Sequence, residues 1–313
     1  MDMLSSSPSS ARLYALLLKL RPLERGTLMP FSGELVHAAF LDWVRVAAPE
    51  VAEWLHEGNK LRLFTCSSLR FPLPTTRVRE AERENTHLPL DPSKTYTVRV
   101  TLLRGELFPL LYEALLRFDT STRGIQQPFM RLGKQAFALE EITTTDASGW
   151  TGFTSYDALL EQAKTAQGSN ALGIEFAALT AFSWTNKTYG NYYANVPLPA
   201  YIFPMLAKRW HAVAPSALSS SVQPERIEHY VQNDGMILHE YNLHSHIVTF
   251  PRHPQRGFVG TCRYTLRRAE EDRPDEGNTP LPVQQQILLL ARFAFYSGIG
   301  YKTAMGMGQV RVL

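Results

Sequence analysis

Hydrophobic and polar positions follow two different periods along the first half of the chain. Alternation with period two predicts a strand, and apolar residues three and four apart predict a helix. The helical spacing is clearest where apolar residues occupy positions 35, 36, 39, 40, 43 and 44. The predicted elements are, in order, a strand (12–20), a helix (32–46), a short helix (49–58), a strand (61–71), a loop or hairpin extension (74–94), a strand (95–104), a helix (105–119) and a strand (128–145).

The second half of the chain shows the same succession of periods. Its predicted elements are a strand (171–184), a helix (199–215), two strands (235–250 and 256–266), a helix (282–298) and a last strand (309–313). In both halves the order is strand, helix, strand, strand, helix, strand, which is typical of a ferredoxin-like unit. The sequence therefore predicts an α+β protein of two tandem ferredoxin-like (RRM-like, βαββαβ) domains, residues 1–147 and 148–313, with a connector at 148–168 that holds its own short helix.

A glycine-rich stretch, GIGYKTAMGMGQV, lies at 298–310, between the last predicted helix and the last predicted strand. It does not match the phosphate-binding pattern GxxxxGK[ST], since Lys302 follows a tyrosine and the helix comes before the strand. It also lacks the third glycine and the following helix of the dinucleotide fingerprint. The stretch therefore predicts no nucleotide cofactor. Two possibilities remain: a loop whose backbone N–H groups approach phosphates beside Lys302, or a glycine turn without a ligand.

Composition narrows the class of protein. The chain has 313 residues, of which 44% are hydrophobic and 19% are charged, as in globular domains. Cys66 and Cys262 are too few for a disulfide framework, and no apolar run reaches the length of a membrane span. A cytoplasmic protein is therefore expected. The net charge of +3 is a weak indication of a polyanionic partner.

Positive charge is concentrated in residues 252–268, which include five arginines and no acidic residue. Within this segment CRYTLRR alternates with period two, and every second residue is apolar. Arg263 and Arg267 are therefore predicted on the basic outer face of a half-buried strand. The alternative is an ordinary solvated face, balanced by the acidic residues of 269–277.

The glycine-rich stretch resembles the signature loop of the CRISPR repeat-processing endoribonucleases of the RAMP superfamily. The shared pattern is Gly–apolar–Gly, then Lys-Thr, then Gly–apolar–Gly and a terminal strand. Residues 54–69 resemble the family's segment around its catalytic histidine, 197–215 the helix of its second domain, and 256–266 the strand before its last helix. The resemblance covers most of the chain. The family's fold, two ferredoxin-like domains, agrees with the order of elements.

The resemblance implies a function. It implies an enzyme that cleaves CRISPR precursor transcripts within the repeat to give mature guide RNAs. The ribose 2′-hydroxyl beside the scissile phosphate attacks it, without metal, and leaves a 2′,3′-cyclic phosphate. No cofactor is implied. The implied partners are the repeat RNA, as precursor and as mature guide, and other Cas proteins of an effector complex; a homodimer is a further possibility, and no membrane is involved.

The resemblance places His56 at the family's catalytic position. The local pattern agrees, because Val51, Trp54 and Leu55 form the apolar stripe of the short helix and His56 lies off that stripe. An outward-facing histidine in the last helical turn is also favoured as imidazolium by the helix dipole, by roughly 0.3–1 kcal/mol. An idle surface histidine is the alternative interpretation.

Other candidates for catalysis lie on either side of His56. Arg62 stands where the family often has a lysine, and Lys60 is the near alternative; either cation could neutralise the extra charge on the phosphate. Some members place a tyrosine fifteen residues before the histidine, where this chain has Leu41. His37, one helical turn earlier, could replace that tyrosine or could be a satisfied histidine on the flank of the helix.

For RNA binding, the resemblance points to the glycine-rich loop and to the basic strand beside it. The candidate residues are Gly298, Gly300, Lys302, Thr303, Gly306 and Gly308 of the loop, with Arg263 and Arg267 of the strand.

Three other interpretations compete with an RNA-cleaving enzyme. His239, His244, His246 and His253 form a histidine-rich segment, but no further ligand follows at a metal-site spacing, so no metal site is expected. A non-catalytic RNA-binding subunit of a CRISPR effector complex would have no need of His56. A ligand-binding ferredoxin-like regulator would not explain a basic strand beside a glycine loop.

Overall fold

The computed structural model describes residues 11–56, 62–116, 129–166, 170–188, 190–250, 254–268 and 281–313. The chain divides into two compact units. The first comprises residues up to Phe153 together with the short segments Ile247–Gln255 and Ala304–Gly306. The second comprises Thr154–His246, Arg256–Thr303 and Met307–Leu313.

The first unit is built on an antiparallel sheet with the strand order β3-β5-β1-β7-β6, and β8 pairs with β1. The strands are β1 (Arg12–Pro22), β3 (Phe64–Cys66), β5 (Tyr96–Leu102), β6 (Phe129–Leu132), β7 (Gln135–Thr143) and β8 (Gly152–Ser155). The path β3-β5-β1-β7 is the order of a βαββαβ unit. A separate two-stranded sheet pairs β2 (Gly26–Leu28) with β4 (Leu88–Leu90).

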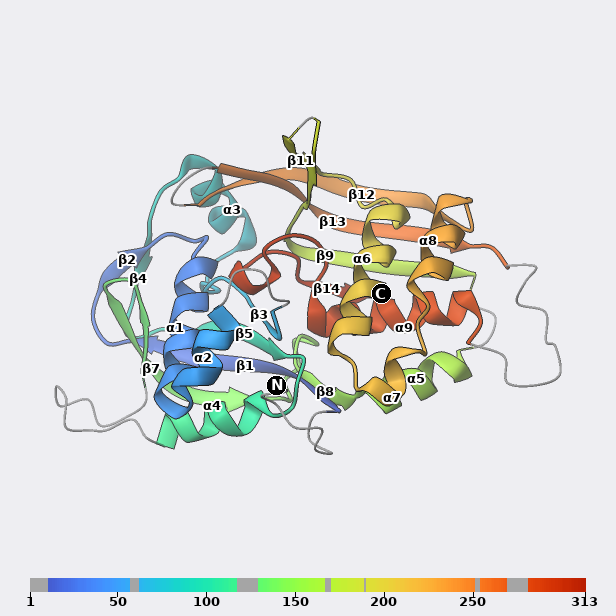
Figure 1. Ribbon diagram of the computed structural model, residues 1–313. Helices are drawn as coiled ribbons and strands as arrows, with labels where there is room; N and C mark the ends of the chain where they lie inside the picture. The colour runs from blue at the N-terminus through green and yellow to red at the C-terminus, as the bar shows by residue number, and fades with distance from the viewer. Residues whose placement is uncertain are drawn as a thin grey trace. The chain divides into compact units, whose positions relative to one another are not determined.

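Helices α1 (Gly33–Ala47), α2 (Pro49–His56) and α4 (Leu107–Leu116) pack together and cover one face of this sheet (Figure 1). The predicted helical stripe is the buried one, since Val36, Phe40 and Val44 of α1 are fully buried. On β1, Leu16 and Leu18 are fully buried as well. The core of the first unit therefore lies between β1 and the face of α1 that the sequence pattern predicted.

The second unit repeats this topology with the strand order β12-β13-β9-β14. Its strands are β9 (Ala171–Thr180), β12 (Met236–Thr249), β13 (Pro254–Leu266) and β14 (Val310–Val312), and its two main helices are α6 (Pro199–Val213) and α9 (Val283–Ser297). α6 packs on α9, which also contacts β14. Both units are therefore ferredoxin-like, and the predicted fold class is confirmed.

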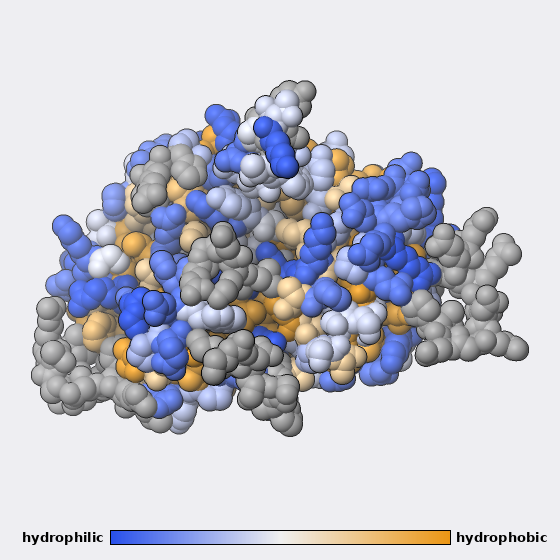
Figure 2. All heavy atoms as spheres, viewed as in Figure 1, coloured by the Kyte–Doolittle hydropathy of each residue, from blue (hydrophilic) through white to orange (hydrophobic). Residues whose placement is uncertain are grey.

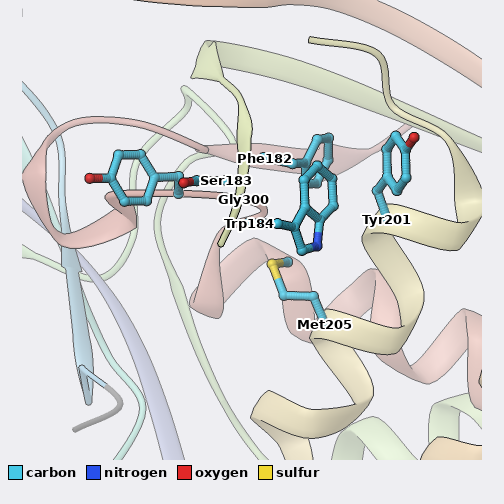
Figure 3. Close-up of a pocket in the computed structure, with 7 residues that line it drawn as sticks. Phe182, Ser183, Trp184, Tyr201, Met205 and Gly300 are labelled. Atoms are coloured by element: carbon cyan, nitrogen blue, oxygen red, sulfur yellow. The ribbon is translucent and has the colours of Figure 1, made fainter. Parts of the chain in front are cut away.

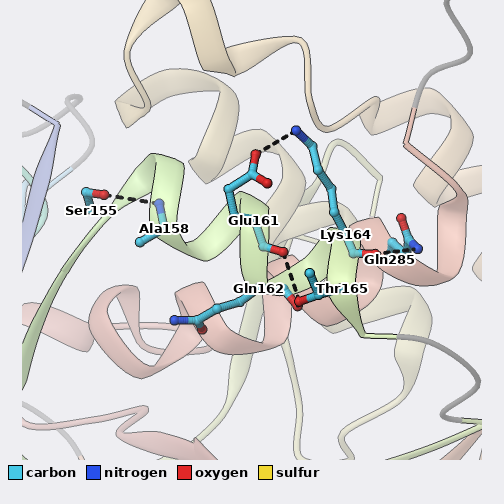
Figure 4. A network of polar contacts seen from close by, with 7 residues as sticks. All are labelled: Ser155, Ala158, Glu161, Gln162, Lys164, Thr165 and Gln285. Carbon is cyan, nitrogen blue, oxygen red and sulfur yellow. Dashed lines mark hydrogen bonds and ion pairs between the residues drawn. The ribbon is translucent and has the colours of Figure 1, made fainter.

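The predicted connector contains a helix, α5 (Tyr156–Thr165), that packs on α9. Its first turn is capped by the Ser155 hydroxyl, which accepts a hydrogen bond from the Ala158 N–H at 3.0 Å (Figure 4). At its other end, the side chain of Gln285 in α9 donates to the Lys164 carbonyl at 3.3 Å. The cap and this bond fix the two ends of α5 within the second unit.

One predicted loop and one predicted strand of the first unit differ in the structure. Residues 74–94, predicted as a loop or hairpin extension, contain the helix α3 (Thr75–Glu84) before β4. This helix buries only Ala81, so its sequence shows no apolar stripe. The strand predicted at 128–145 is a hairpin, because Gly133, at a φ of 62°, turns the chain between β6 and β7.

The sequence pattern also missed elements of the second unit. The strand predicted to run to residue 184 ends at Thr180, and β10 (Phe182–Asn186) pairs instead with β11 (Gly190–Ala194) in a two-stranded hairpin. Two helices, α7 (Ser216–Ser219) and α8 (Pro224–Gln232), follow α6. Hydrophilic residues dominate the surface over α8, whose apolar residues are buried (Figure 2).

Among the described residues, no helix combines the length and the apolar composition that crossing a membrane requires.

Candidate active site and RNA-binding elements

Three of the four predicted catalytic residues lie close together in the first unit. The guanidinium of Arg62 donates through Nη2 to the backbone carbonyl of His56 at 3.3 Å. The charges of Arg62 and His56 both act on His37, where they help to lower the pKa of its imidazole. The fourth residue, Lys60, lies outside the described residues. Helix α2, helix α1 and the segment that leads into β3 thus bring these candidates to one place.

His56 is the last residue of α2, and its side chain is exposed. The neighbouring Val51 and Leu55 are buried, as the apolar stripe predicted. The backbone carbonyl that Arg62 contacts belongs to the C-terminal end of this helix, where carbonyls lack partners within the helix and a positive charge is favourable. Arg62 therefore stabilises the helix end that presents His56 to solvent.

His37 is buried, with 7% of its surface exposed. Its ring stacks on Phe64 of β3, with 5.3 Å between the ring centroids. Burial is the main cause that lowers its pKa from 6.5 to about 4, and the charges of Arg62 and His56 act in the same direction. A hydrogen bond with the backbone of Ala304 opposes the shift. His37 is therefore neutral at physiological pH.

Two polar atoms beside this group have no hydrogen-bond partner among the described residues. They are Nδ1 of His37 and Nη1 of Arg62, and both are buried. Burial also lowers the pKa of Arg62. Unpaired buried polar atoms are rare in folded proteins, and they recur at sites that bind a ligand. Within the described part of the chain, Nη1 of Arg62 is a donor that no protein group occupies.

The tip of the glycine-rich loop, Ala304–Gly306, belongs to the first unit. The N–H of Gly306 donates to the carbonyl of Cys66 at the end of β3, at 3.0 Å. Gly306 has a φ of 92°, and a Cβ at this position would lie 2.8 Å from the Ser68 hydroxyl. At Gly33, the first residue of α1, a Cβ would lie 2.2 Å from the Met305 carbonyl oxygen. Only glycines allow this approach of loop, helix and strand.

The other loop glycines pack against backbone of the second unit. All of them have positive φ values, between 68° and 90°. A Cβ on Gly308 would lie 2.1 Å from the carbonyl oxygen of Ile299, and one on Gly300 would lie 2.5 Å from that of Ala181. The amides of Gly298, Ile299, Tyr301 and Gly308 already donate to backbone carbonyls of this unit. Because these glycines have no side chain, the backbone segments of this unit can pack closely against them. The four amides donate to carbonyls of the protein backbone.

Arg209 of α6 binds the start of the same loop. Its guanidinium donates to the carbonyls of Ser297 and Gly298 at the C-terminal end of α9, at 2.5 and 3.2 Å. Burial lowers the pKa of Arg209 to about 10. The arginine therefore remains charged at neutral pH and stabilises the end of the helix from which the loop starts.

The remaining predicted RNA-binding residues of the second unit, three cations and a threonine, differ in their surroundings. Lys302 has a φ of 53°, an uncommon value for a residue with a side chain, and its Nζ lies 5.4 Å from the centroid of the Tyr301 ring. Thr303 is buried, and its methyl group packs beside Gly298 and Gly308. Arg263 is exposed on β13, as the alternation predicted, and pairs with Glu240 at 3.3 Å. Arg267 is exposed just after the strand.

The described residues contain no group of three or more His, Cys, Asp or Glu side chains that could hold a metal ion. Of the four histidines in the histidine-rich segment, His253 lies outside the described residues.

Comparison with known proteins agrees with this arrangement. Residues 13–161 match the family model of the CRISPR Cas6 N-terminal domain, and residues 174–310 match that of the CRISPR-associated endoribonuclease Cas6. The chain belongs to the Cas6 family. The resemblance in the glycine-rich loop and in the histidine segment therefore led to the right family. As a Cas6 protein, the chain is an RNA-cleaving enzyme that processes CRISPR repeat RNA.

Solved Cas6 structures share the fold. The product complex of Thermus thermophilus Cas6 (TTHB231) aligns with a TM-score of 0.72 at 23% identity, covering 97% of this chain and 100% of that one. A substrate mimic complex of another Cas6 (TTHA0078) aligns with a TM-score of 0.60 at 20% identity, covering 97% and 100%. A Cas6-related protein from Pyrococcus furiosus aligns at 0.52 and 13%, covering 96% and 98%. None of the curated proteins matches the sequence.

One feature of this Cas6 chain was missed from the sequence. The hairpin β10–β11 carries Phe182, Trp184, Tyr192 and Tyr193, and a small cavity lies between β10, α6 and the glycine-rich loop (Figure 3). The aromatic content of 182–193 was the available signal, but a continuous strand prediction through residue 184 concealed it. No local signal indicated that the loop tip belongs to the first unit.

Proposed function

We propose that this Cas6 protein cleaves CRISPR precursor transcripts within the repeat by a metal-independent reaction. The 2′-hydroxyl of the ribose beside the scissile phosphate attacks the phosphorus, and the bond to the 5′ oxygen of the next nucleotide breaks. The products are a 2′,3′-cyclic phosphate and a 5′-hydroxyl. The observation that carries the proposal is the exposed His56 at the end of α2, with the Arg62 guanidinium on its backbone carbonyl.

His56 is the proposed proton-transfer residue. The reaction needs removal of the 2′-hydroxyl proton and delivery of a proton to the leaving oxygen, and a histidine has a pKa suited to both steps. His37 is the weaker candidate, because a buried imidazole with a pKa of about 4 is not protonated near pH 7 and so cannot act as the acid, and its low pKa also makes it a weak base. We assign His37 a positioning role between Phe64 and the backbone of Ala304.

Arg62 is the proposed cation for the transition state. The pentacoordinate phosphorus carries an additional negative charge, and a fixed guanidinium stabilises that charge at no reorganisation cost. One side of the Arg62 guanidinium is anchored on the His56 carbonyl, and the other, Nη1, has no partner among the described residues. Lys60 remains an alternative on sequence grounds alone.

RNA binding outside the cleavage site is proposed for Lys302, Arg263 and Arg267. Lys302 supplies its charge beside the Tyr301 ring, Arg263 supplies its charge on β13 next to Glu240, and Arg267 supplies its charge just after the strand. The loop glycines and Thr303 take part indirectly, because they hold the backbone that presents Lys302. Retention of the guide RNA within an assembly of other Cas proteins, or as a homodimer, is compatible with this role and stays a prediction.

The test combines one RNA change with one protein change. In EDTA, the wild-type protein should cleave repeat RNA and leave a cyclic phosphate, while a repeat with a single 2′-deoxy sugar just upstream of the cut should bind and stay intact. Cleavage of the deoxy substrate at the normal rate would exclude the mechanism.

The matched protein change compares two exposed histidines of the first unit. His56→Ala should cut about 10²–10⁴-fold more slowly with unchanged affinity, the range for loss of a general acid–base group. His87→Ala, an exposed histidine after α3, should cut normally. Full activity of His56→Ala would leave a non-catalytic RNA-binding subunit, or catalysis by another residue, as the remaining interpretations.

A further inference from the structure

The cavity of the second unit lies where the hairpin β10–β11, helix α6 and the glycine-rich loop meet. Its walls are Phe182, Ser183, Trp184, Tyr201, Met205, Gly300 and Tyr301. In the close-up, the rings of Phe182, Trp184 and Tyr201 lie side by side, and the thioether of Met205 points toward them (Figure 3). All of these residues belong to one unit, so the cavity does not depend on the placement of the other.

The aromatic rings form a layered arrangement. Trp184 stacks on Tyr192 across the hairpin, with centroids 5.3 Å apart and ring planes 24° apart, and it contacts Tyr201 of α6 at 4.6 Å. On the other face of the hairpin, Tyr193 meets Tyr301 edge to face at 6.1 Å. Tyr192 and Tyr193 remain 47% and 45% exposed. Aromatic surface that is left open in this way is unusual for a core and typical of sites that stack planar ligands.

The size of the cavity limits what could occupy it. Its volume is about 160 Å³, well below the roughly 300–1,000 Å³ of sites for drug-sized ligands. A single planar ring system fits a space of this size, whereas a complete nucleotide cofactor does not. Gly300 and Ser183 are the small residues of its wall.

Positive charge lies next to the aromatic wall. Lys302 has its Nζ 5.4 Å from the centroid of the Tyr301 ring. Lys208 is exposed one turn beyond Met205 on α6, and Lys187 is exposed at the turn of the hairpin. Aromatic side chains that take bases, flanked by cations that take phosphates, are the combination by which proteins bind unpaired nucleic acid.

We propose that this cavity accepts one unpaired base of the repeat RNA, held against the wall to which Trp184, Tyr201 and Tyr301 contribute, with the adjoining phosphate beside Lys302. The proposal rests on the proposed function, because it takes the repeat RNA as ligand. It adds a base-binding subsite away from the cleavage chemistry. A base held there would fix the register of the RNA on the second unit, so that its loss weakens binding while the chemistry of cleavage remains.

The experiment measures equilibrium binding of a non-cleavable 2′-deoxy repeat to the full chain. Tyr301→Leu should weaken binding by about 5- to 100-fold, as for loss of one base–aromatic stack. Tyr301→Phe keeps the ring and should rescue this loss. Tyr112→Leu, which removes an exposed tyrosine of α4 in the first unit, is the matched control and should bind normally. A thermal melt of each variant separates binding from folding.

A scan of abasic repeats identifies the base. At one unpaired position, the abasic substitution should weaken binding to the wild type by the same factor as Tyr301→Leu, and it should have no further effect on Tyr301→Leu. If Tyr301→Leu lowers the melting temperature, Met205→Trp provides a second variant, which fills the cavity and leaves every ring in place. It should show the same loss.

Two results would overturn the inference. One is normal affinity for both Tyr301→Leu and Met205→Trp, as expected if the exposed rings serve a protein partner instead. The other is additive losses at every abasic position. Failure of the proposed function is seen separately, as cleavage of the 2′-deoxy repeat on the same gel or as absence of cleavage of the all-ribose repeat.

Discussion

The buried imidazole of His37 makes the stability of the first unit depend on pH. Its pKa is about 4 in the folded chain and 6.5 as an ordinary histidine. The unfolded chain therefore binds a proton at a higher pH than the folded one. The contribution of His37 to the free energy of unfolding is fully present above about pH 6.5 and is lost as the pH drops from 6.5 to about 4. Below about pH 4 this group causes no further change.

The magnitude follows from the size of the shift. Each pKa unit corresponds to about 1.4 kcal/mol, so the shift from 6.5 to about 4 corresponds to roughly 3 kcal/mol in total. At pH 5, where the unfolded histidine is protonated and the folded one is still mainly neutral, about 2 kcal/mol of this has been lost. That is a large part of the stability of an ordinary domain.

The assay is urea unfolding of the wild type and of His37→Leu in a series of buffers from pH 7.5 to pH 4. The absolute stability of His37→Leu is not informative, because the variant also changes packing on Phe64. The informative quantity is the difference in unfolding free energy between the two proteins, which should shift by about 2 kcal/mol in favour of the variant between pH 7 and pH 5. Other titrating groups are shared and cancel in this difference.

A control and a neighbouring group complete the experiment. His87→Leu removes an exposed histidine and should keep the pH dependence of the wild type. Because the charges of Arg62 and His56 act on His37, the series is repeated in His56→Ala, where part of the pKa shift should be relieved. Parallel pH profiles for wild type and His37→Leu would refute the reasoning and would mean that His37 is solvated or already paired when protonated.

Three further predictions concern the glycine-rich loop. Gly308→Ala should destabilise the second unit by more than Gly190→Ala in a thermal melt: both positions have positive φ, but the new Cβ would meet the Ile299 carbonyl at 2.1 Å in the first and nothing within 4 Å in the second; equal losses would mean that only backbone strain matters. Arg209→Met should cost about 1–3 kcal/mol of unfolding free energy in urea, since two carbonyls at the end of α9 lose their donor; an unchanged midpoint would contradict this role. Lys302→Asn removes the charge but tolerates the left-handed backbone, so it should weaken repeat binding and flatten its salt dependence by about 0.7 in log–log slope; an unchanged slope would show that Lys302 contacts no phosphate.

The amino-acid sequence by itself determined the succession of elements and therefore the fold class. The alternation of CRYTLRR placed Cys262, Tyr264 and Leu266 inside and Arg263 outside, as the structure shows. The apolar stripe of α2 placed His56 outward. These features are readable because a periodic pattern is a local property, in which each residue's side is set by neighbours two to four positions away.

The tertiary structure alone shows the surroundings of the candidate residues. The contacts of His37 with Phe64 and with the backbone of Ala304, and the neutrality that follows from its burial, cannot be read from the local pattern. The hydrogen bond from Gly306 at the loop tip to the carbonyl of Cys66 joins residues far apart in the chain, and no local pattern predicts it. The physical reason is that burial, pKa and close backbone approach depend on which distant segments meet, and nothing in the local period encodes those partners.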